Sequence, residues 1–401
     1  MTYIPTDFNN SAGADSFGRT RVSEPYTLFD SSFRFNDNVE KWDTAETNNS
    51  GNVDTSFNSV EGLMNLTVGT STGDQIIRET NRVFAYQPGK SLLVLNSFTM
   101  ATAKENLRQR VGYFGSNCGI FLEQDGSEIY IVKRVNGIDT RILQQNWSED
   151  RLDGTGGSKI ELDLSKSQIF WCDIEWLGVG SVRCGFVING NFYTCHIFHH
   201  ANIDVSTYML TASLPIRYEI TNSNNTDSDS TMKQICSTVI SEGGFSQRNI
   251  TRSASIPVTT PISFANAGDR KGIIAIRLRE NYTDSIVVPF NIDLYGSQNS
   301  PFQFQLIRNS SITGGSWVYN DSISTVEYNR TMTNFSGGTI LLEGIFKGQT
   351  YYNRDLIEYG SQLQLTRNIN AIVGEVFLLA ITCTSNQDSV LASLSWMEHT
   401  T

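Results

Sequence analysis

Short runs of alternating apolar and polar residues, separated by dipeptides that favour tight turns, recur along most of the chain. Asp125-Gly126, Asn136-Gly137 and Asn189-Gly190 each stand between two such runs. These dipeptides readily adopt the positive φ angles that two-residue hairpins require. No run shows the three turns of apolar periodicity that predict an amphipathic helix. The sequence therefore predicts an all-β chain whose strands pair in antiparallel hairpins.

The most regular part of the sequence predicts three antiparallel strands at Ile169–Trp176, Val182–Ile188 and Asn191–Phe198. Other runs in the first half predict strands at Arg82–Tyr86, Leu92–Met100, Leu107–Phe114, Gly119–Gln124, Glu128–Val135, Thr140–Gln144, Ile216–Ile220 and Lys233–Ile240. Runs in the second half predict strands at Gly272–Leu278, Ser285–Leu294, Phe302–Ile307, Thr339–Lys347, Leu363–Leu365, Glu375–Thr384 and Ser389–Trp396.

The length of 401 residues predicts more than one domain, because single cores stop growing at roughly 250 residues. The polar, glycine-containing stretch 241–255 predicts a boundary near residue 245. We therefore expect two successive antiparallel β-sandwich domains, jelly-roll-like, at 36–244 and 245–401. Residues 1–35 lack helical periodicity and are expected to form an extended N-terminal docking arm.

Charge and hydropathy exclude several classes of function. The formal net charge is −11 and no basic run is present, so a nucleic-acid partner is not expected. No stretch approaches the ~20 apolar residues of a membrane helix, and the N-terminus does not resemble a signal peptide, so we expect an unexported chain without membrane insertion. The six cysteines show no C-x-x-C pair, which predicts buried free thiols.

Two acidic residues on one predicted strand face could serve glycan cleavage. Asp173 and Glu175 are two residues apart, and Trp171 on the same face could stack a sugar ring. Alternating acids on an outer strand face are also ordinary solvated positions, and no neighbouring motif completes a hydrolase signature. A glycan-cleaving enzyme is therefore the remote alternative, and no catalytic residue is assigned.

A histidine cluster is the other group that could carry chemistry. His196, His199 and His200 end a predicted strand, and with Asp204 they could hold a metal ion. They can equally fill and cap the strand, and no metal or other cofactor is assigned. Nucleophile elbows, Walker loops and dinucleotide-binding fingerprints do not occur in the sequence. The sequence thus predicts a protein that is not an enzyme.

Aromatic residues at turn-rich positions are candidates for contact with a glycan or with another subunit. They are Trp147, Trp317, Tyr319, Tyr351 and Tyr352. Aromatic enrichment marks interfaces of both kinds, so the sequence leaves sugar and protein as alternatives.

The run Phe17-Gly18-Arg19-Thr20-Arg21-Val22-Ser23-Glu24-Pro25-Tyr26-Thr27-Leu28-Phe29-Asp30 resembles the opening segment of a family of tailed-phage virion proteins, F-G-R-L-R-V-S-x-P-x-T-L-F-D. It departs from this form at Thr20, where leucine is usual. The run 234–244 is also reminiscent of such proteins. The resemblance implies a virion structural protein, made in the host cytoplasm, in a capsid-decoration, head-fibre, baseplate or tail-fibre role.

As a docking arm, the N-terminal segment would attach the chain to itself or to other capsid or tail proteins. Apolar anchors, an extended backbone at proline and two arginines suit that role. The residues concerned are Phe17, Arg19, Arg21, Val22, Pro25, Tyr26, Leu28 and Phe29. The segment can also form the first strands of its own sandwich. A homo-oligomer, with a trimer favoured, is the expected partner state, and the alternative function is a host-recognition adhesin that binds surface polysaccharide.

Overall fold

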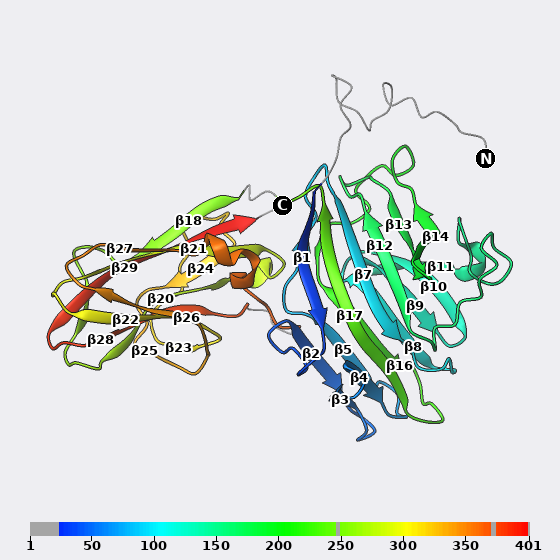
Figure 1. The fold of residues 1–401 in the computed structure, drawn as a ribbon, viewed down its shortest axis with the longest axis horizontal. Coiled ribbons are helices and arrows are strands. Elements are labelled where there is room, and N and C mark those ends of the chain that lie inside the picture. Colours follow the sequence, from blue (N-terminus) through cyan, green and yellow to red (C-terminus); the bar gives the residue numbers. More distant parts are fainter. Residues whose placement is uncertain (1–23, 246–248, 370–373, 400–401) are drawn as a thin grey trace.

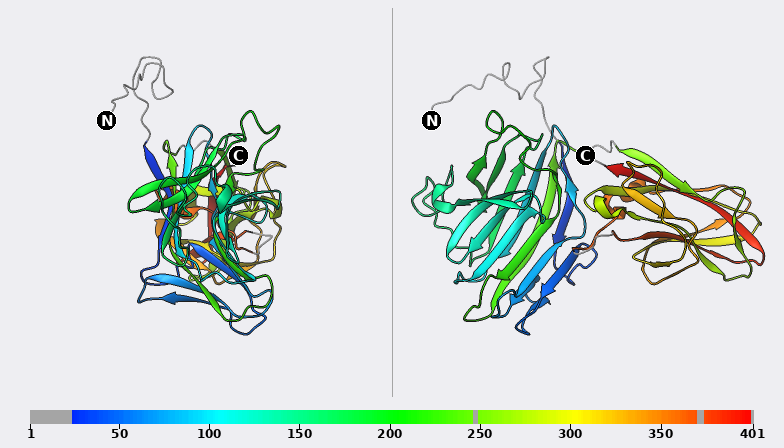
Figure 2. Two further views of the ribbon diagram at one scale, coloured as in Figure 1. Left: turned by 90° about the vertical axis from the view of Figure 1, so that its right-hand side faces the viewer. Right: turned by 180° about the vertical axis from the view of Figure 1, so that it is seen from behind.

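The strands form two β-sandwiches that follow each other along the sequence and lie side by side (Figures 1 and 2). The computed structural model describes residues 24–245, 249–369 and 374–399. Within these residues the helical segments are short 3₁₀ turns: η2 (Gln144–Asn146), η3 (Glu280–Tyr282) and η4 (Ile357–Leu363). The prediction of an all-β chain built as two antiparallel sandwiches is confirmed.

The first sandwich packs an eight-stranded sheet on a seven-stranded sheet. The eight-stranded sheet has the order β14 (Asn191–Phe198), β13 (Val182–Ile188), β12 (Gln168–Ile174), β7 (Ser91–Thr99), β17 (Ser230–Glu242), β4 (Leu63–Val68), β3 (Asp54–Asn58), and β1 (Pro25–Ser32) also pairs with β17. The seven-stranded sheet has the order β11 (Ile138–Leu143), β10 (Glu128–Val135), β9 (Gly119–Asp125), β8 (Leu107–Phe114), β16 (Ile216–Asn222), β5 (Gln75–Thr80), β2 (Trp42–Thr47). A small pair, β6 (Phe84–Ala85) and β15 (Ser213–Leu214), closes one end.

Two predicted turns fix the hairpins of this sandwich. Asn136 and Gly137 have φ angles of 50° and 76°, and Asn189 and Gly190 have φ angles of 52° and 78°. Positive φ at both central residues gives the turn whose twist matches paired strands. The chain therefore reverses tightly between β10 and β11 and between β13 and β14.

Alternation along each strand builds the core of the first sandwich. In β7, every second residue from Leu92 to Phe98 is buried. Phe170 and Phe186 meet them from β12 and β13, with ring centroids 5.5 Å apart, and Tyr113 projects from the opposite sheet. Burial of such side chains contributes about 1.5–3 kcal/mol each, so this two-layer core is the main source of stability.

The second sandwich packs two five-stranded sheets on each other. One has the order β18 (Ile250–Ser255), β29 (Asp388–His399), β21 (Ile286–Gly296), β27 (Tyr352–Asp355), with β19 (Ile262–Phe264) also on β29. The other has the order β24 (Val326–Asn329), β20 (Arg270–Leu278), β28 (Phe377–Cys383), β22 (Pro301–Arg308), β26 (Thr339–Lys347), and β23 (Ser311–Thr313) pairs separately with β25 (Asn334–Ser336). Trp396 is fully buried in this core, and its indole Nε1 donates to Glu398 over 2.9 Å.

Some local expectations differ from the structure. Leu363–Leu365 is not a strand: Leu363 ends the 3₁₀ turn η4, and the Leu365 backbone N–H donates to the Val287 carbonyl on β21 over 2.8 Å. Leu363 and Leu365 are buried, as the apolar pattern indicated. The predicted strand Arg82–Tyr86 is reduced to Phe84–Ala85. All six cysteines are free thiols, but Cys236 is exposed rather than buried.

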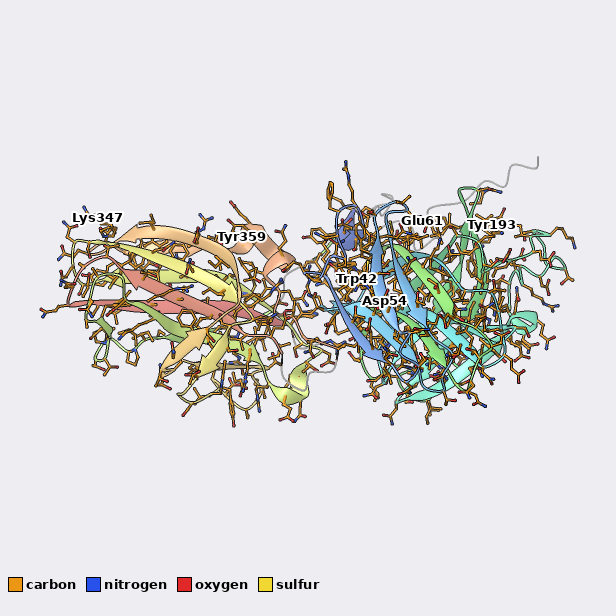
Figure 3. All side chains as sticks on the ribbon, turned by 90° about the horizontal axis from the view of Figure 1, so that it is seen from below. Trp42, Asp54, Glu61, Tyr193, Lys347 and Tyr359 are labelled. Carbon is orange, nitrogen blue, oxygen red and sulfur yellow. The ribbon has the colours of Figure 1, made fainter. Side chains whose placement is uncertain are left out.

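Polar contacts join the two sandwiches. Arg367, before β28, donates to Glu79 on β5 over 3.2 Å, and the Ile369 backbone N–H donates to Asp43 over 2.8 Å. Arg308 at the end of β22 pairs with Glu40. Figure 3 shows Trp42, next to this junction, on the side of the first sandwich that faces the second. The junction is thus an interface of ion pairs rather than a shared apolar core.

Candidate functional site

The described part of the N-terminal segment, residues 24–30, lies next to the run 234–244. β1 pairs antiparallel with the second half of β17, from Pro25 opposite Glu242 to Ser32 opposite Cys236. About 200 residues separate the two strands in the sequence. Phe17, Arg19, Arg21 and Val22 lie outside the described residues. The described half of the motif is therefore an edge of the eight-stranded sheet.

This placement corrects the expectation of an extended arm as far as residue 35. Phe29 is only 4% exposed and packs on Phe84 and Trp42, with centroid distances of 5.0 and 5.8 Å. Leu28 also packs against the first core. Both belong to the chain's own sandwich, because a register shift between Thr27 and Phe29 interrupts the alternation of β1 at Leu28 and lets the two adjacent side chains contact the core. Pro25 and Tyr26 are exposed at the start of the strand, where Tyr26 stacks on Phe245.

The outer surface of the eight-stranded sheet carries an apolar patch, here called the outer apolar face. It consists of Leu93, Leu95, Ile169, Val187, Phe192, Ile235 and Ile240. Phe192 is 56% and Ile169 38% exposed. Two adjoining grooves of about 350 and 670 Å³ share Ser97 and Ile169. Strands that face solvent normally show polar residues there, so this face is unusual for an isolated sandwich.

One end of the same sheet holds a polar pocket of about 510 Å³, here called the end pocket. Its lining includes Asp173 on β12, Glu175 directly after it, Glu242 at the end of β17, and the basic residues Lys90 and Arg183. Arg183 donates to Asp173 Oδ2. Asp173 is 7% exposed, and its Oδ1 has no hydrogen-bond partner among the described residues. A buried carboxylate oxygen without a donor is costly, which marks this pocket as a place where a donor would bind.

The end pocket contains the acid pair considered for glycan cleavage, but Trp171 does not contribute a sugar platform. Trp171 is 4% exposed and its ring lies 5.5 Å from that of Phe192. The expectation that Trp171 could stack a sugar is therefore wrong. Alternation put Trp171 on the outer face, as predicted, but Phe192 on β14 packs against it across Gly185 of β13.

Trp147 is likewise unavailable as a surface contact. It is 3% exposed, its ring packs 6.4 Å from Phe186, and its Nε1 donates to the Ile142 carbonyl over 3.1 Å. The candidate role of Trp147 in glycan or subunit contact is therefore wrong. The loop after β11 folds over the end of the sandwich, so this aromatic residue becomes part of the core.

Trp317 and Tyr319 come together on the second sandwich, each with an arginine over its ring. Arg277 lies 4.0 Å from the Trp317 centroid, and Arg279 lies 4.2 Å from that of Tyr319. Arg277 is on β20 and Arg279 directly follows its last residue. Glu327 on β24 accepts from Arg277 over 2.6 Å. We call these side chains the arginine–aromatic surface; a planar, ordered guanidinium beside an aromatic face suits recognition of polar ligands.

Tyr351 and Tyr352 lie elsewhere, at the start of β27 in the other sheet. Tyr351 is 67% exposed, and its hydroxyl donates to Asp293. Tyr352 is half-buried against Phe304 and Phe346. The structure therefore does not unite the four remaining aromatic candidates in one site.

The histidines of the first sandwich have separate partners. His196 Nδ1 accepts from the Ser148 backbone N–H over 3.1 Å, and His200 stacks on Tyr208 at 3.8 Å. His199 lies 3.2 Å from the Ser181 hydroxyl in the end pocket. Within residues 24–245, 249–369 and 374–399 no three histidine, cysteine or acidic side chains are grouped to hold a metal ion.

A network of arginines and carboxylates lies on the outer face of the seven-stranded sheet, and no motif in the sequence predicted it. Glu219, Arg110 and Glu123 lie side by side in register on β16, β8 and β9. Burial alone would raise the pKa of Glu219. The positive charges of Arg217, Arg110 and Arg108 together outweigh this effect, so the pKa of Glu219 is lowered. Arg110 and Glu123 face each other across consecutive strands, and the pairing of β8 with β16, which is distant in sequence, adds Glu219.

Comparisons with known proteins show structural similarity only. No known family matches the chain, and no curated protein does. The carbohydrate recognition domain of Emp47p aligns over 58% of this chain and 100% of its own, with 10% identity and a TM-score of 0.36. A GH16 protein of Bacteroides ovatus, solved with a glucan product, covers 53% and 99% at 12% identity and a TM-score of 0.36. A legume lectin-like domain from Entamoeba histolytica covers 52% and 95% at 10% identity and a TM-score of 0.32. The sheet order and register of the chain itself define its two sandwiches.

Proposed function

We propose that this chain is a non-enzymatic structural protein of a tailed-phage virion that associates with copies of itself. The observation that carries the proposal is the pairing of the two resembling segments in β1 and β17 at the edge of the eight-stranded sheet. In the described residues β1 pairs on one side only. An exposed strand edge is a template for association with another chain.

The outer apolar face supports the same role. It lies on the sheet that β1 extends, and its grooves reach Asp30, Ser32 and Cys236. Asp173 is engaged by Arg183 rather than poised as a free acid beside Glu175. These features favour a surface for protein contact over one for catalysis. A second copy is the occupant we propose for the outer apolar face.

Purified particles of the phage that encodes this chain provide the test. Quantitative peptide mass spectrometry is expected to find the chain at a fixed stoichiometric ratio to the major capsid protein. Light scattering of the purified chain is expected to give an oligomer, with a trimer as the expected state. Absence from washed particles would overturn the virion assignment, and a monomer at all concentrations would overturn self-association.

A second candidate function is host recognition through polysaccharide binding, which the arginine–aromatic surface favours. Trp317→Ala and Tyr319→Ala are expected to weaken saturable glycan binding about tenfold each. Each change removes an aromatic ring and its cation–π contact, and such contacts contribute about 0.5–2 kcal/mol. Trp147→Phe, a change at a buried indole, is the control for a general effect of losing tryptophan. No binding across a broad glycan array would overturn this candidate.

A further inference from the structure

The end pocket of the first sandwich accepts cationic side chains, and we propose that the Arg19–Arg21 segment of a second copy supplies them. This inference rests on the proposed self-association and names its contact. The pocket presents three carboxylates, those of Asp173, Glu175 and Glu242.

Each of these carboxylates already has one oxygen engaged. Arg183 donates to Asp173 Oδ2, the Ser181 backbone N–H to Glu175 Oε2 over 3.5 Å, and the Ser91 hydroxyl to Glu242 Oε2 over 3.2 Å. Asp173 Oδ1, nine-tenths buried, is left without a donor. With Lys90 and Arg183 counted, the acids still exceed the bases by one. The site therefore lacks hydrogen-bond donors and positive charge, which a guanidinium provides together.

The chain carries such groups a few residues before β1 in the sequence. Glu242 lies opposite Pro25, so residues 19–21 precede the strand that borders the pocket by only a few positions. Arg19 and Arg21 are two residues apart, so an extended backbone directs both to the same side. Their spacing suits two anchors in one acidic pocket.

The choice of a second copy follows from the proposed self-association. Arg21 is four residues from Pro25, which corresponds to about 13 Å of extended chain. Asp173 lies on β12, three strands from β1 across β17 and β7, or about 14 Å. Because the arginine side chain adds to this reach, the same chain also spans the distance, and the mixing experiment below distinguishes the two sources.

Charge exchange between full-length chains tests the inference. One variant carries Arg19→Glu with Arg21→Glu, and the other carries Glu175→Lys with Glu242→Lys. Each alone is expected to weaken self-association at least tenfold in light scattering at low salt. An equimolar mixture is expected to restore part of it, because each altered segment can then meet a pocket of opposite charge, although one contact in a ring of three copies still joins like charges. Arg34→Glu and Glu105→Lys, exposed charges outside the pocket, are the matched controls and are expected to change little.

The outcomes separate this inference from the proposed function. Loss in each variant without recovery on mixing would mean that the segment binds its own pocket, and this would overturn the second-copy assignment. Oligomers that resist both charge reversals would overturn the pocket contact while self-association stands. A wild-type chain that remains monomeric would overturn both. Circular dichroism melting of each variant checks that the change in charge has not unfolded the sandwich.

Discussion

Arg110 on β8 and Glu123 on β9 form an ion pair with an Nε–Oε2 distance of 2.5 Å on the outer face of the seven-stranded sheet. Arg110 is 7% exposed and Glu123 is fully buried. Arg110 also reaches Glu219 at 3.2 Å and Asp139 at 3.5 Å. The sheet thus carries buried, mutually neutralised charge where a solvated strand face would be expected.

Glu123→Gln is expected to lower the free energy of unfolding of the first sandwich by about 3 kcal/mol, because removing one partner leaves buried arginines uncompensated. Urea denaturation followed by tryptophan fluorescence measures this loss. Glu61→Gln removes the exposed pair with Lys233 and is expected to cost less than about 1 kcal/mol. Equal effects at the two sites would contradict the importance of burial.

His196 predicts a loss of stability in mild acid. Burial, with a smaller effect of His199, lowers the pKa of His196 to about 4. An unfolded histidine titrates near 6.5, so the unfolded state binds more protons between these values and stability falls as the pH drops from about 6.5 to 4. His196→Gln is expected to reduce the difference between urea midpoints measured at pH 7.5 and 4.5. An unchanged difference would show that other groups, such as His200, govern this range.

Self-association through the outer apolar face predicts a strong effect of polar substitutions there. Ile169→Asp is expected to raise the dissociation constant of the oligomer at least tenfold, because it places a charge in an apolar interface. Val60→Asp, at a residue 93% exposed in a hairpin loop, is the control. Analytical ultracentrifugation measures both.

Cys236 offers an independent readout of the same face. Its thiol is exposed and lines one of the two grooves. Its reaction with a maleimide reagent is expected to slow as the protein concentration rises and copies associate. A labelling rate independent of concentration would place the interface elsewhere.

The junction between the sandwiches predicts coupled stability. Burial raises the pKa of Glu79, while Arg367 and Arg217 lower it. Arg367→Met is expected to destabilise the junction by about 1–3 kcal/mol and to separate the calorimetric transitions of the two sandwiches. Arg151→Met, at an exposed arginine of the first sandwich, is expected to leave the thermogram unchanged.

Much of the local structure could be read from the sequence. Leu107–Phe114, Glu128–Val135, Val182–Ile188 and Thr339–Lys347 were predicted as strands with the bounds that the structure has. Alternation and turn-forming residues act over a few positions, so strands and hairpins can be predicted from them without tertiary contacts. The placement of β1 could not be predicted from the sequence, because its partner in β17 lies about 200 residues away.

The sequence by itself determined the fold class, the hairpins and the cysteine, charge and motif content of this protein. Tertiary structure alone decided which polar and aromatic side chains remain accessible. Trp147 and Trp171 are covered by segments that no local pattern places over them. Trp317 and Tyr319 lie beside Arg277 on β20 and Arg279 directly after it. The physical reason is that backbone propensity and alternation depend on neighbours in the chain, whereas burial and ion pairing depend on neighbours in space.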